Sequence, residues 1–496
     1  MVVGSFAMAV TVGLLPPALL VLMAWAIAVL RVSRPGLPIS LYRWLTCVAL
    51  GGALVASLIT LYGIRLGQKG VGLIAYGGGL IVDRFSVLSA VILIVIAGVT
   101  VLLCGSFAER IRSRAAALHA LVLVSTAAAI MMASQHEMIA LYVSLQLLLI
   151  CTAVLAGLDK TTRRSGEAAL KHLVLGAAGS AVLLYGLALL YGVTGSTDLT
   201  SVAAAHNRAP VLTSIGIALS VLGLTAAVGA LPLHQWIGQV SSGAPAVVAG
   251  FMATEGVIAG VMAYLRVTVG GFGAGVRPWM ELTAVIAAIT VLYAGLRAVR
   301  GQNLRRLAGS LILAQVGFML MGVLSVSQGP DHRAGIVALL LYVMTMGVTA
   351  PALYGVIDVL ESAGLGDGDE DHRGLGHRNG WSSLVLVAAL MALGGLPPLA
   401  LFIARLLVLE SAVAAGFAWV VAVGAVGAVL IATGCVRFIA QMYAGGGEQA
   451  RFSIRGAPRL SRVTLTVCAA SAVILSALAQ PLLAVSSGGA GTLPLH

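Results

Sequence analysis

Charged residues are scarce in this chain of 496 residues, because Asp, Glu, Lys and Arg together make up 9% of it. Soluble domains carry about 25%. The five cysteines are scattered and form no CxxC motif or Cys/His cluster, which argues against structural zinc and iron–sulfur clusters. The sequence also lacks a Walker motif, a dinucleotide fingerprint after a strand and a metalloprotease helix. We therefore expect no cofactor and no metal to be bound by this chain.

Long apolar runs fill the sequence instead. Hydrophobic residues make up 60% of the chain, and the mean hydropathy is +1.05. A helix needs roughly 20 apolar residues to cross the hydrocarbon core of a bilayer. The sequence therefore predicts an all-α polytopic membrane protein, residues 1–496 forming a single membrane domain. About fourteen spans are expected, at 6–30, 44–64, 85–107, 115–134, 138–157, 170–193, 211–231, 246–269, 280–298, 307–327, 334–357, 382–404, 412–436 and 463–484.

The basic residues follow this count of spans. If the N-terminus faces outside, 21 Lys and Arg residues fall in inward loops and 7, including Arg266, fall in outward loops, while Arg405 lies inside a span. Inward loops are the ones that carry excess positive charge. We expect a bacterial inner membrane protein with both termini outside. The formal net charge of +12 is then explained by orientation in the lipid bilayer, and no nucleic acid is expected as a partner.

The longest polar stretch is Asp358–Asn379, which contains an acidic cluster at 367–371. We expect it to be a solvated loop between two spans. The Ser- and Gly-rich tail after Ala484 is expected to be disordered.

Five stretches carry a family resemblance. They are LHALVLVSTAAAIMMASQHEMIALYVSLQLLLICTAVLAG (118–157), EAALKHLVLGAAGSAVLLYGLALLYG (167–192), LPLHQWIGQVSSGAPAVVAGFMATEGVIAGVMAYLR (231–266), NLRRLAGSLILAQVGF (303–318) and GGLPPLALFIARLL (394–407). Together they resemble the antiporter-like membrane subunits shared by NADH–quinone oxidoreductase (complex I), membrane-bound hydrogenases and Mrp-type cation/proton antiporters. EAALKHLVLGAAGSAVLLYG and APAVVAGFMAT are most similar to subunit N.

The resemblance implies fourteen helices that contain two inverted five-helix repeats, each with one broken helix. Helices 1–3 would lie within 1–107, the first repeat at 115–269, the second at 280–436, and the last helix and tail at 463–496. Two Pro- and Gly-rich segments fit the breaks: Leu231–Pro245 in the first half and Gly394–Pro398 in the second. Such interruptions free backbone groups at mid-membrane, where transporters build polar sites. Ordinary kinks are the alternative reading.

The family is thought to move protons through buried ionisable residues, and this chain departs from that pattern. Gln146 stands at the position of a glutamate, Ala227 and Val257 at those of two lysines, Gln315 at that of a histidine, and Arg405 at that of a lysine. Glutamine, alanine and valine cannot titrate, and arginine keeps its charge. The first half therefore lacks the titratable side chains that a lysine-based relay needs.

Glu255 and His234 are candidates to replace that relay. An acid inside a span is costly and usually functional, so Glu255 is read either as a proton-exchanging group or as a wetted residue near the break. His234 is its nearest partner by sequence; it serves a proton or water chain, or it packs through hydrogen bonds. Glu137 and His136 are expected at the interface.

Arg405 is read as a counter-charge on the polar axis or as a side chain that snorkels to the interface, with Glu410 or an acid of another subunit as partner. Lys171 is interpreted as a supporting residue of the relay or as a snorkelling one. Asp83 and Arg84 are expected to start a helix. The proton-path candidates are thus Glu255, His234, Arg405, Lys171, Gln146 and Gln315.

The resemblance implies a non-redox membrane subunit of a proton-translocating NADH–quinone oxidoreductase-like or hydrogenase-like complex. It would supply a proton path, degenerate or intact, or a scaffold among other membrane subunits, with quinone or nickel–iron chemistry in the partners. An Mrp-type cation/proton antiporter subunit is the alternative. A stand-alone solute transporter is less favoured, because no substrate-binding cluster is evident.

Overall fold

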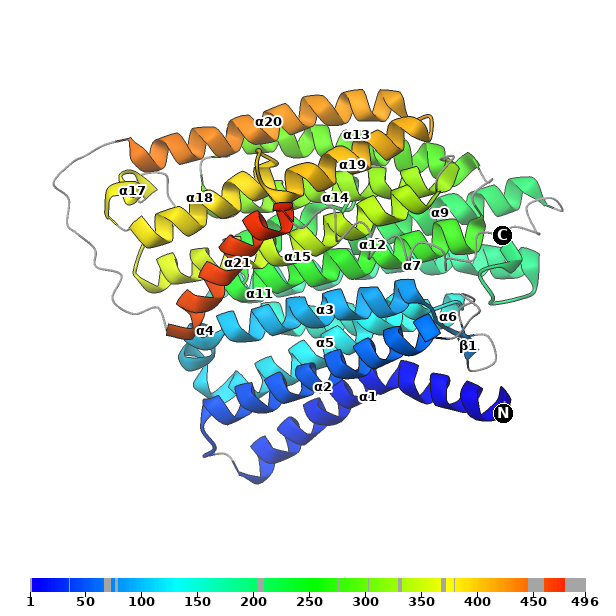
Figure 1. Ribbon diagram of the computed structural model, residues 1–496, viewed down its shortest axis with the longest axis horizontal. Coiled ribbons are helices and arrows are strands. Elements are labelled where there is room, and N and C mark those ends of the chain that lie inside the picture. The colour runs from blue at the N-terminus through cyan, green and yellow to red at the C-terminus, as the bar shows by residue number, and fades with distance from the viewer. Residues whose placement is uncertain are drawn as a thin grey trace.

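The computed structural model describes residues 2–34, 36–66, 73–75, 79–202, 209–273, 277–301, 303–328, 332–366, 372–378, 380–444 and 459–477. Within them the chain is a bundle of helices that lie side by side, with α1 and α20 at opposite edges and α12, α14 and α15 between them (Figure 1). A pair of short antiparallel strands joins Leu73–Ala75 to Leu80–Val82.

The described elements follow one another along the chain as a run of α-helices, with two short strands, a 3₁₀ turn and two π-helical turns among them. They are α1 (Val2–Ser33), α2 (Ile39–Leu66), β1 (Leu73–Ala75), β2 (Leu80–Val82), α3 (Arg84–Leu103), α4 (Gly105–Arg110), the 3₁₀ turn η2 (Arg112–Arg114), α5 (Ala115–Ser134), α6 (Met138–Ala156), α7 (Arg163–Thr194), α9 (Pro210–Val228), α10 (Gln235–Gly243), α11 (Ala246–Phe251), the π-helical turn η3 (Met252–Gly256), α12 (Val257–Leu265), the π-helical turn η4 (Arg266–Phe272), α13 (Arg277–Arg300), α14 (Leu304–Gln328), α15 (His332–Ser362), α17 (Leu375–Arg378), α18 (Gly380–Gly394), α19 (Ala400–Ala414), α20 (Ala418–Tyr443) and α21 (Arg459–Ala477).

Twelve helical segments of the described residues are long and apolar enough to cross a membrane. They correspond to twelve of the expected spans, and the all-α polytopic membrane fold is confirmed. The expected span 382–404 is divided between α18 and α19, and α21 occupies the expected last span as far as Ala477. The expected span 412–436 is displaced, since α20 begins only at Ala418. Residues 478–484 and the tail lie outside the described residues.

Burial separates a centre from a rim. The most apolar windows of 246–272, α14 and α15 are 94%, 100% and 89% buried inside the protein, whereas those of α1, α7 and α20 are 28–33% buried. A helix that is hydrophobic all round but largely exposed is suited to lipid. The rim helices are therefore the lipid- or partner-facing ones, and polar groups that need protection belong to the centre.

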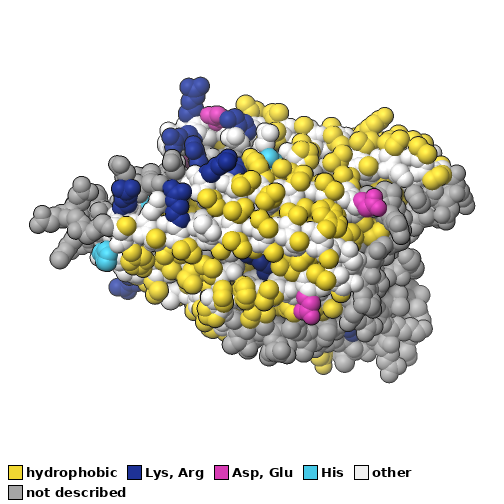
Figure 2. Space-filling view, turned by 90° about the horizontal axis from the view of Figure 1, so that it is seen from above, with side chains coloured by type: hydrophobic (Ala, Val, Ile, Leu, Met, Phe, Trp, Pro, Cys, Tyr) yellow, Lys and Arg dark blue, Asp and Glu magenta, His cyan; other side chains and the backbone are white. Residues whose placement is uncertain are grey.

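The surface in Figure 2 is mostly hydrophobic, and the Lys and Arg side chains gather toward the end of the molecule where α17 lies and α20 finishes. This distribution agrees with the segregation of basic residues on which the expected count of spans depends.

Two helices are broken where the sequence predicted it. In the first half α9 ends at Val228 and Gly229 follows with φ of +80°; α10 then starts at Gln235. In the second half α18 ends at Gly394, Gly395 has φ of +69°, and α19 starts at Ala400. Only glycine adopts such angles readily, so each glycine stops its helix.

The expected solvated loop at Asp358–Asn379 is partly wrong. Helix α15 continues to Ser362, and Asp358 is 2% exposed because its Oδ2 accepts a hydrogen bond from the Ser106 hydroxyl of α4. His372 is also buried, and Leu375–Arg378 forms a helical turn. The acidic cluster at 367–371 lies outside the described residues.

Candidate functional site

Arg405 lies buried in the gap of the second broken helix. It is 3% exposed, and its guanidinium donates to the Gly394 and Leu393 carbonyls, each at 3.2 Å. These carbonyls belong to the last turn of α18, where the helix dipole places partial negative charge. The guanidinium also lies over the Phe318 ring, 4.3 Å from its centroid. The broken helix thus supplies the acceptors that stabilise a buried cation.

Gln315 joins this cluster from α14. Its Oε1 accepts from Arg405 Nη2 at 3.3 Å and from the Tyr342 hydroxyl of α15. Its Nε2 donates to the Leu393 carbonyl at 2.9 Å and to Leu311 O at 3.0 Å. Two of the expected residues, Gln315 and Arg405, therefore meet in one polar centre built from four helices.

No carboxylate pairs with Arg405 among the described residues. The expected pairing with Glu410 is wrong, because Glu410 is exposed and lies five residues, about 140° of helical rotation, from the buried face. Snorkelling is also inconsistent with this structure, since the guanidinium turns back toward the α18 terminus. Arg405 is a buried cation held by neutral acceptors.

Glu255 is completely buried in the π-helical turn η3. Neither carboxyl oxygen has a hydrogen-bond partner among the described residues. The Thr126 hydroxyl of α5 lies beside the carboxyl but donates to the Val122 carbonyl. Glu255 therefore caps no helix, and its role as a proton-exchanging or wetted group stays a prediction.

His234 does not meet Glu255. It is half-buried in the connection before α10, where Nδ1 lies 3.2 Å from the Pro232 carbonyl. Its ring packs edge-on against Tyr293 of α13, with centroids 4.8 Å apart. The structure thus shows a packed, locally hydrogen-bonded histidine, and a role in a proton or water chain stays a prediction.

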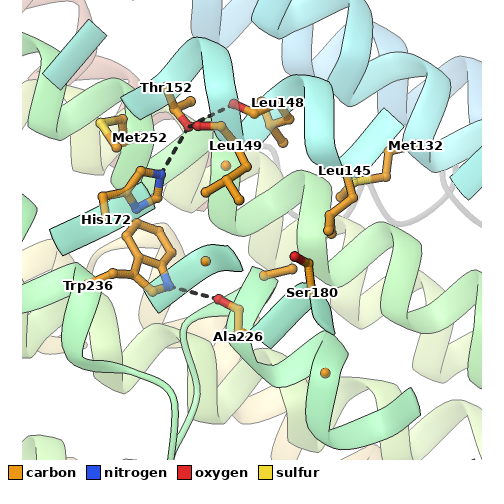
Figure 3. A pocket seen from close by; sticks show the side chains of 14 residues that line it. Met132, Leu145, Leu148, Leu149, Thr152, His172, Ser180, Ala226, Trp236 and Met252 are labelled. Atoms are coloured by element: carbon orange, nitrogen blue, oxygen red, sulfur yellow. Dashed lines mark hydrogen bonds between the residues drawn. The ribbon is translucent and has the colours of Figure 1, made fainter. Parts of the chain in front are cut away.

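A cavity of about 50 Å³ lies beside the first broken helix (Figure 3). His172 of α7 lines it and is 6% exposed, with Nε2 3.1 Å from the Thr152 hydroxyl of α6. The Trp236 ring of α10 lies 5.0 Å from the imidazole, and its Nε1 donates to the Ala226 carbonyl at the end of α9 at 2.8 Å. Here an indole, rather than a cation, satisfies the freed helix terminus.

One of the emptied lysine positions, Ala227, lines this cavity, and the other, Val257, follows directly after the lining residue Gly256. Gln146 of α6 donates to the Ser180 hydroxyl at 3.0 Å and to the Tyr142 hydroxyl at 2.6 Å, and Ser180 also lines the cavity. Gln146 therefore keeps a polar connection at the glutamate position without a titratable group.

Lys171 lies half-buried at the margin between α7 and α10. Its Nζ pairs with Glu167 one turn earlier at 2.6 Å and donates to the Gln239 side chain at 3.3 Å. Exposed pairs of this kind contribute about 0–1 kcal/mol, so the contact with α10 matters more for position than for stability. A supporting role beside the first break remains a prediction.

Arg266 was expected in an outward loop, and that expectation is wrong. It is 1% exposed in η4, and it forms a two-pronged ion pair with Asp83, Nη1–Oδ2 2.7 Å and Nη2–Oδ1 3.0 Å. Asp83 also starts α3, as predicted, since it accepts from the Ser86 backbone N–H in a reciprocal cap. The pair ties the end of the eighth span to the start of the third.

Arg305 fixes the end of α10, the helix that follows the first break. Arg305 of α14 donates to the Ser241 and Ala244 carbonyls at the end of α10, at 3.1 and 2.6 Å, and it pairs with Glu361 of α15. The Ser241 hydroxyl also contacts the Tyr354 hydroxyl at 2.6 Å. The end of α10 is thereby fixed to the buried centre.

Sequence reasoning missed His172, Tyr342 and Arg266. His172 shares a helix face with Gly176 and Ser180 at a spacing of four, which marks a polar stripe in an apolar helix. Arg266 stands between apolar residues in AYLRVTV, much as Arg405 does in FIARLL, and that context was the available signal. Tyr342 is a single tyrosine in an apolar run, and the sequence gives no signal of its role.

The chain is similar to proteins of known assemblies. The family model described as "NADH:quinone oxidoreductase/Mrp antiporter, TM" matches residues 135–431. NADH-quinone oxidoreductase subunit N 2 of Symbiobacterium thermophilum is 33% identical over 408 residues, 78% of this chain and 80% of that one.

Solved structures agree with this match. A chain of respiratory complex I from Thermus thermophilus is 26% identical, covers 96% of this chain and 100% of its own length, and superposes with a TM-score of 0.78. A chain of the Mrp complex from Dietzia sp. DQ12-45-1b is 19% identical, covers 97% and 98%, and has a TM-score of 0.82, which shows the shared fold. The protein belongs to the NADH:quinone oxidoreductase/Mrp antiporter transmembrane family, as an antiporter-like membrane subunit.

Proposed function

We propose that this chain is a non-redox membrane subunit of a respiratory or hydrogenase-like complex that translocates protons, and that it contributes a fixed positive charge at its second break. The observation that carries the proposal is Arg405, a buried cation that α18 carbonyls, Gln315 and a phenylalanine ring stabilise without a carboxylate. A charge in a membrane interior is costly and ordinarily has a functional reason.

The charge acts through its field, because a guanidinium does not release its proton at physiological pH. Two unit charges about 6 Å apart interact by about 3 kcal/mol at an effective dielectric of about 20. A field of that size favours the ionised form of an acid on a neighbouring subunit and opposes the approach of a further cation. Glu255 is the complementary group, a buried acid that can exchange a proton once water or a partner reaches it.

The relatives favour a respiratory complex over an Mrp antiporter. Subunit N of an NADH-quinone oxidoreductase is 33% identical to this chain, whereas the likeness to the Mrp chain is one of fold at 19% identity. Redox centres then belong to partner subunits, the protein lies in a bacterial inner membrane, and both termini face outside.

The experiment is proton uptake by vesicles that carry the native complex, measured per electron transferred, with assembly followed by native electrophoresis. Glu255→Gln and Arg405→Ala are compared with Glu281→Gln, an exposed acid at the start of α13. We expect fewer protons per electron in the first two variants and an unchanged number of protons per electron in the third. Unchanged stoichiometry in an assembled complex would overturn the conducting role and leave the subunit as a scaffold.

A further inference from the structure

One face of α7 carries a polar stripe through the first half of the molecule. His172, Gly176 and Ser180 are spaced by four residues, so they lie above one another on a single helix face. All three line the cavity beside the first break. Leu149 packs directly against Gly176 between the two polar residues, since a Cβ at Gly176 would lie 2.3 Å from Leu149 Cδ1.

The facing helix α6 presents matching polar groups. Thr152 contacts His172, and Gln146 contacts Ser180, so the two contacts lie six residues apart on α6 and eight residues apart on α7. Gln146 continues the line to the Tyr142 hydroxyl. Toward the start of α7, Lys171 reaches Gln239 and Glu167. Polar groups therefore extend along most of the α6–α7 seam, with the cavity in its middle.

The hydrogen bonds of Thr152 fix the tautomer of His172. The threonine hydroxyl donates to the Leu148 carbonyl at 2.7 Å, so its oxygen is left to accept from His172 Nε2–H. Nδ1 then carries the lone pair, and it has no hydrogen-bond partner among the described residues. A ring nitrogen of this kind can accept a hydrogen bond from a water molecule or take up a proton.

The cavity that His172 lines has room for water. A water molecule needs at least about 10–15 Å³ of such space and two or more polar partners, and the cavity offers about 50 Å³ with His172, Thr152 and Ser180 in its lining. None of the fourteen lining residues is an Asp, Glu, Lys or Arg. His172 is therefore the titratable group of this cavity.

We propose that His172 is a proton-carrying residue of the first half, between Lys171 at the α7–α10 margin and the Ser180–Gln146–Tyr142 end of the α6–α7 seam. The inference rests on the proposed function, since a proton path has use only in a proton-translocating complex. An excess proton carried by water in the cavity binds to Nδ1 and forms the imidazolium; the imidazolium then releases the Nδ1 proton to another water, which restores the neutral Nε2–H tautomer. No group of the chain is otherwise altered.

No other residue that lines the cavity titrates, and Glu255, next to the lining residue Gly256, lies beside Thr126 of α5 instead. Gln146 and Thr152 do not titrate, and Ala227 has no polar atom. From α10 the neighbours are Trp236 and Gln239, and the charges of Lys171 and Glu167 are engaged with each other. The apolar lining disfavours a resting charge, so the imidazole stays neutral and holds the proton only in transit.

Trp236 offers a direct readout. Its indole lies 5.0 Å from the imidazole, ring centroid to ring centroid, and a protonated imidazole quenches the fluorescence of an indole in contact with it. The full chain in lipid nanodiscs is titrated from about pH 8 to about pH 3. We expect a reversible loss of tryptophan fluorescence that is absent in His172→Gln and in Trp236→Phe. A loss that persists unchanged in His172→Gln, or no loss in the wild type, would overturn the protonation of His172.

Proton transfer is tested in the assembled complex. Protons per electron are measured for His172→Gln and for His119→Gln, a matched control, because His119 is equally buried in α5 but lines none of the cavities described above. We expect a loss in the first variant only. If Arg405→Ala and Glu255→Gln lower the ratio while His172→Gln does not, this inference fails and the proposed function stands. If none of them changes it, the conducting function fails, whatever the fluorescence shows.

Discussion

Arg266 and Arg405 are both buried, and each guanidinium lies over a phenylalanine ring, 5.0 Å from the centroid of Phe85 and 4.3 Å from that of Phe318. They differ in what neutralises them. Arg266 meets the two carboxylate oxygens of Asp83, whereas Arg405 meets backbone carbonyls and an amide oxygen. The same residue type therefore forms a neutral pair in one region and a net charge in the other.

This difference indicates a structural role for Arg266 and a functional role for Arg405. A buried ion pair adds little stability beyond that of apolar residues, but loss of one member leaves a bare charge. Asp83 and Arg266 hold together segments far apart in the sequence, and their summed charge is zero. Arg405 keeps a net positive charge where lipid and protein make charge expensive, so its retention calls for a role beyond packing.

The largest effect is expected for Asp83→Asn. The substitution leaves Arg266 charged and buried, which destabilises by about 3–5 kcal/mol. Thermal unfolding of the purified protein measures it. The double variant Asp83→Asn with Arg266→Met removes the charge as well, and it should recover part of the loss. A double variant less stable than Asp83→Asn would contradict the neutral-pair interpretation.

Gly395→Ala should come next. The residue has φ of +69°, which costs a side chain about 1–2 kcal/mol, and a Cβ would lie 2.1 Å from Arg405 Nη1. Displacement of the guanidinium adds about 1–3 kcal/mol, the usual range for overpacking. Gly229→Ala is the matched control in the first half, where the Cβ meets the flexible tip of Ile237. Equal losses in both variants would show that Arg405 is not tightly held.

Arg405→Met should cost less, about 1–3 kcal/mol, because the Gly394 carbonyl loses its donor but a desolvated charge also disappears. Gln315 keeps its bond from Tyr342, which limits the damage. Unfolding measurements on the isolated chain and on the complex are compared. A loss as large as that of Asp83→Asn, seen only in the complex, would indicate that another subunit supplies a carboxylate and that the contrast between the two arginines disappears on assembly.

The smallest effect is expected for Glu410→Gln. Glu410 is exposed on the opposite side of α19 from Arg405, and surface substitutions of this kind change stability by less than about 0.5 kcal/mol. Proton translocation should also be unchanged. A clear loss in either measurement would revive Glu410 as the counter-ion of Arg405.

Apolar length was sufficient to predict most of the spans, and Pro/Gly content together with the family resemblance predicted both breaks, since each depends largely on local chain chemistry. Gln315 and Arg405 were each singled out from the sequence, but only the packing of α14, α18 and α19 shows that they share one centre. The pairing of Glu255 with His234 failed for the same reason. Nearness in sequence does not place two side chains on the same side of a broken helix.

Arg266 and Asp358 show a different limit. Both stand near the end of a span, where a charged residue normally reaches water and is counted as part of a loop. Each finds a partner from a distant segment, Asp83 for Arg266 and Ser106 for Asp358, and so stays buried. The partner is what decides the location, and it cannot be identified from the local sequence.

The carbonyl-held guanidinium at the second break has a consequence for leakage. Sodium, potassium and hydronium all carry the sign that Arg405 carries, and a fixed positive group in a narrow passage rejects such ions, as arginines do in water channels. A membrane that stores energy as an ion gradient loses it through any pore that cations can cross. We therefore expect Arg405, which cannot pass a proton onward, to oppose the leakage of cations through this part of the subunit whether or not the complex is turning over.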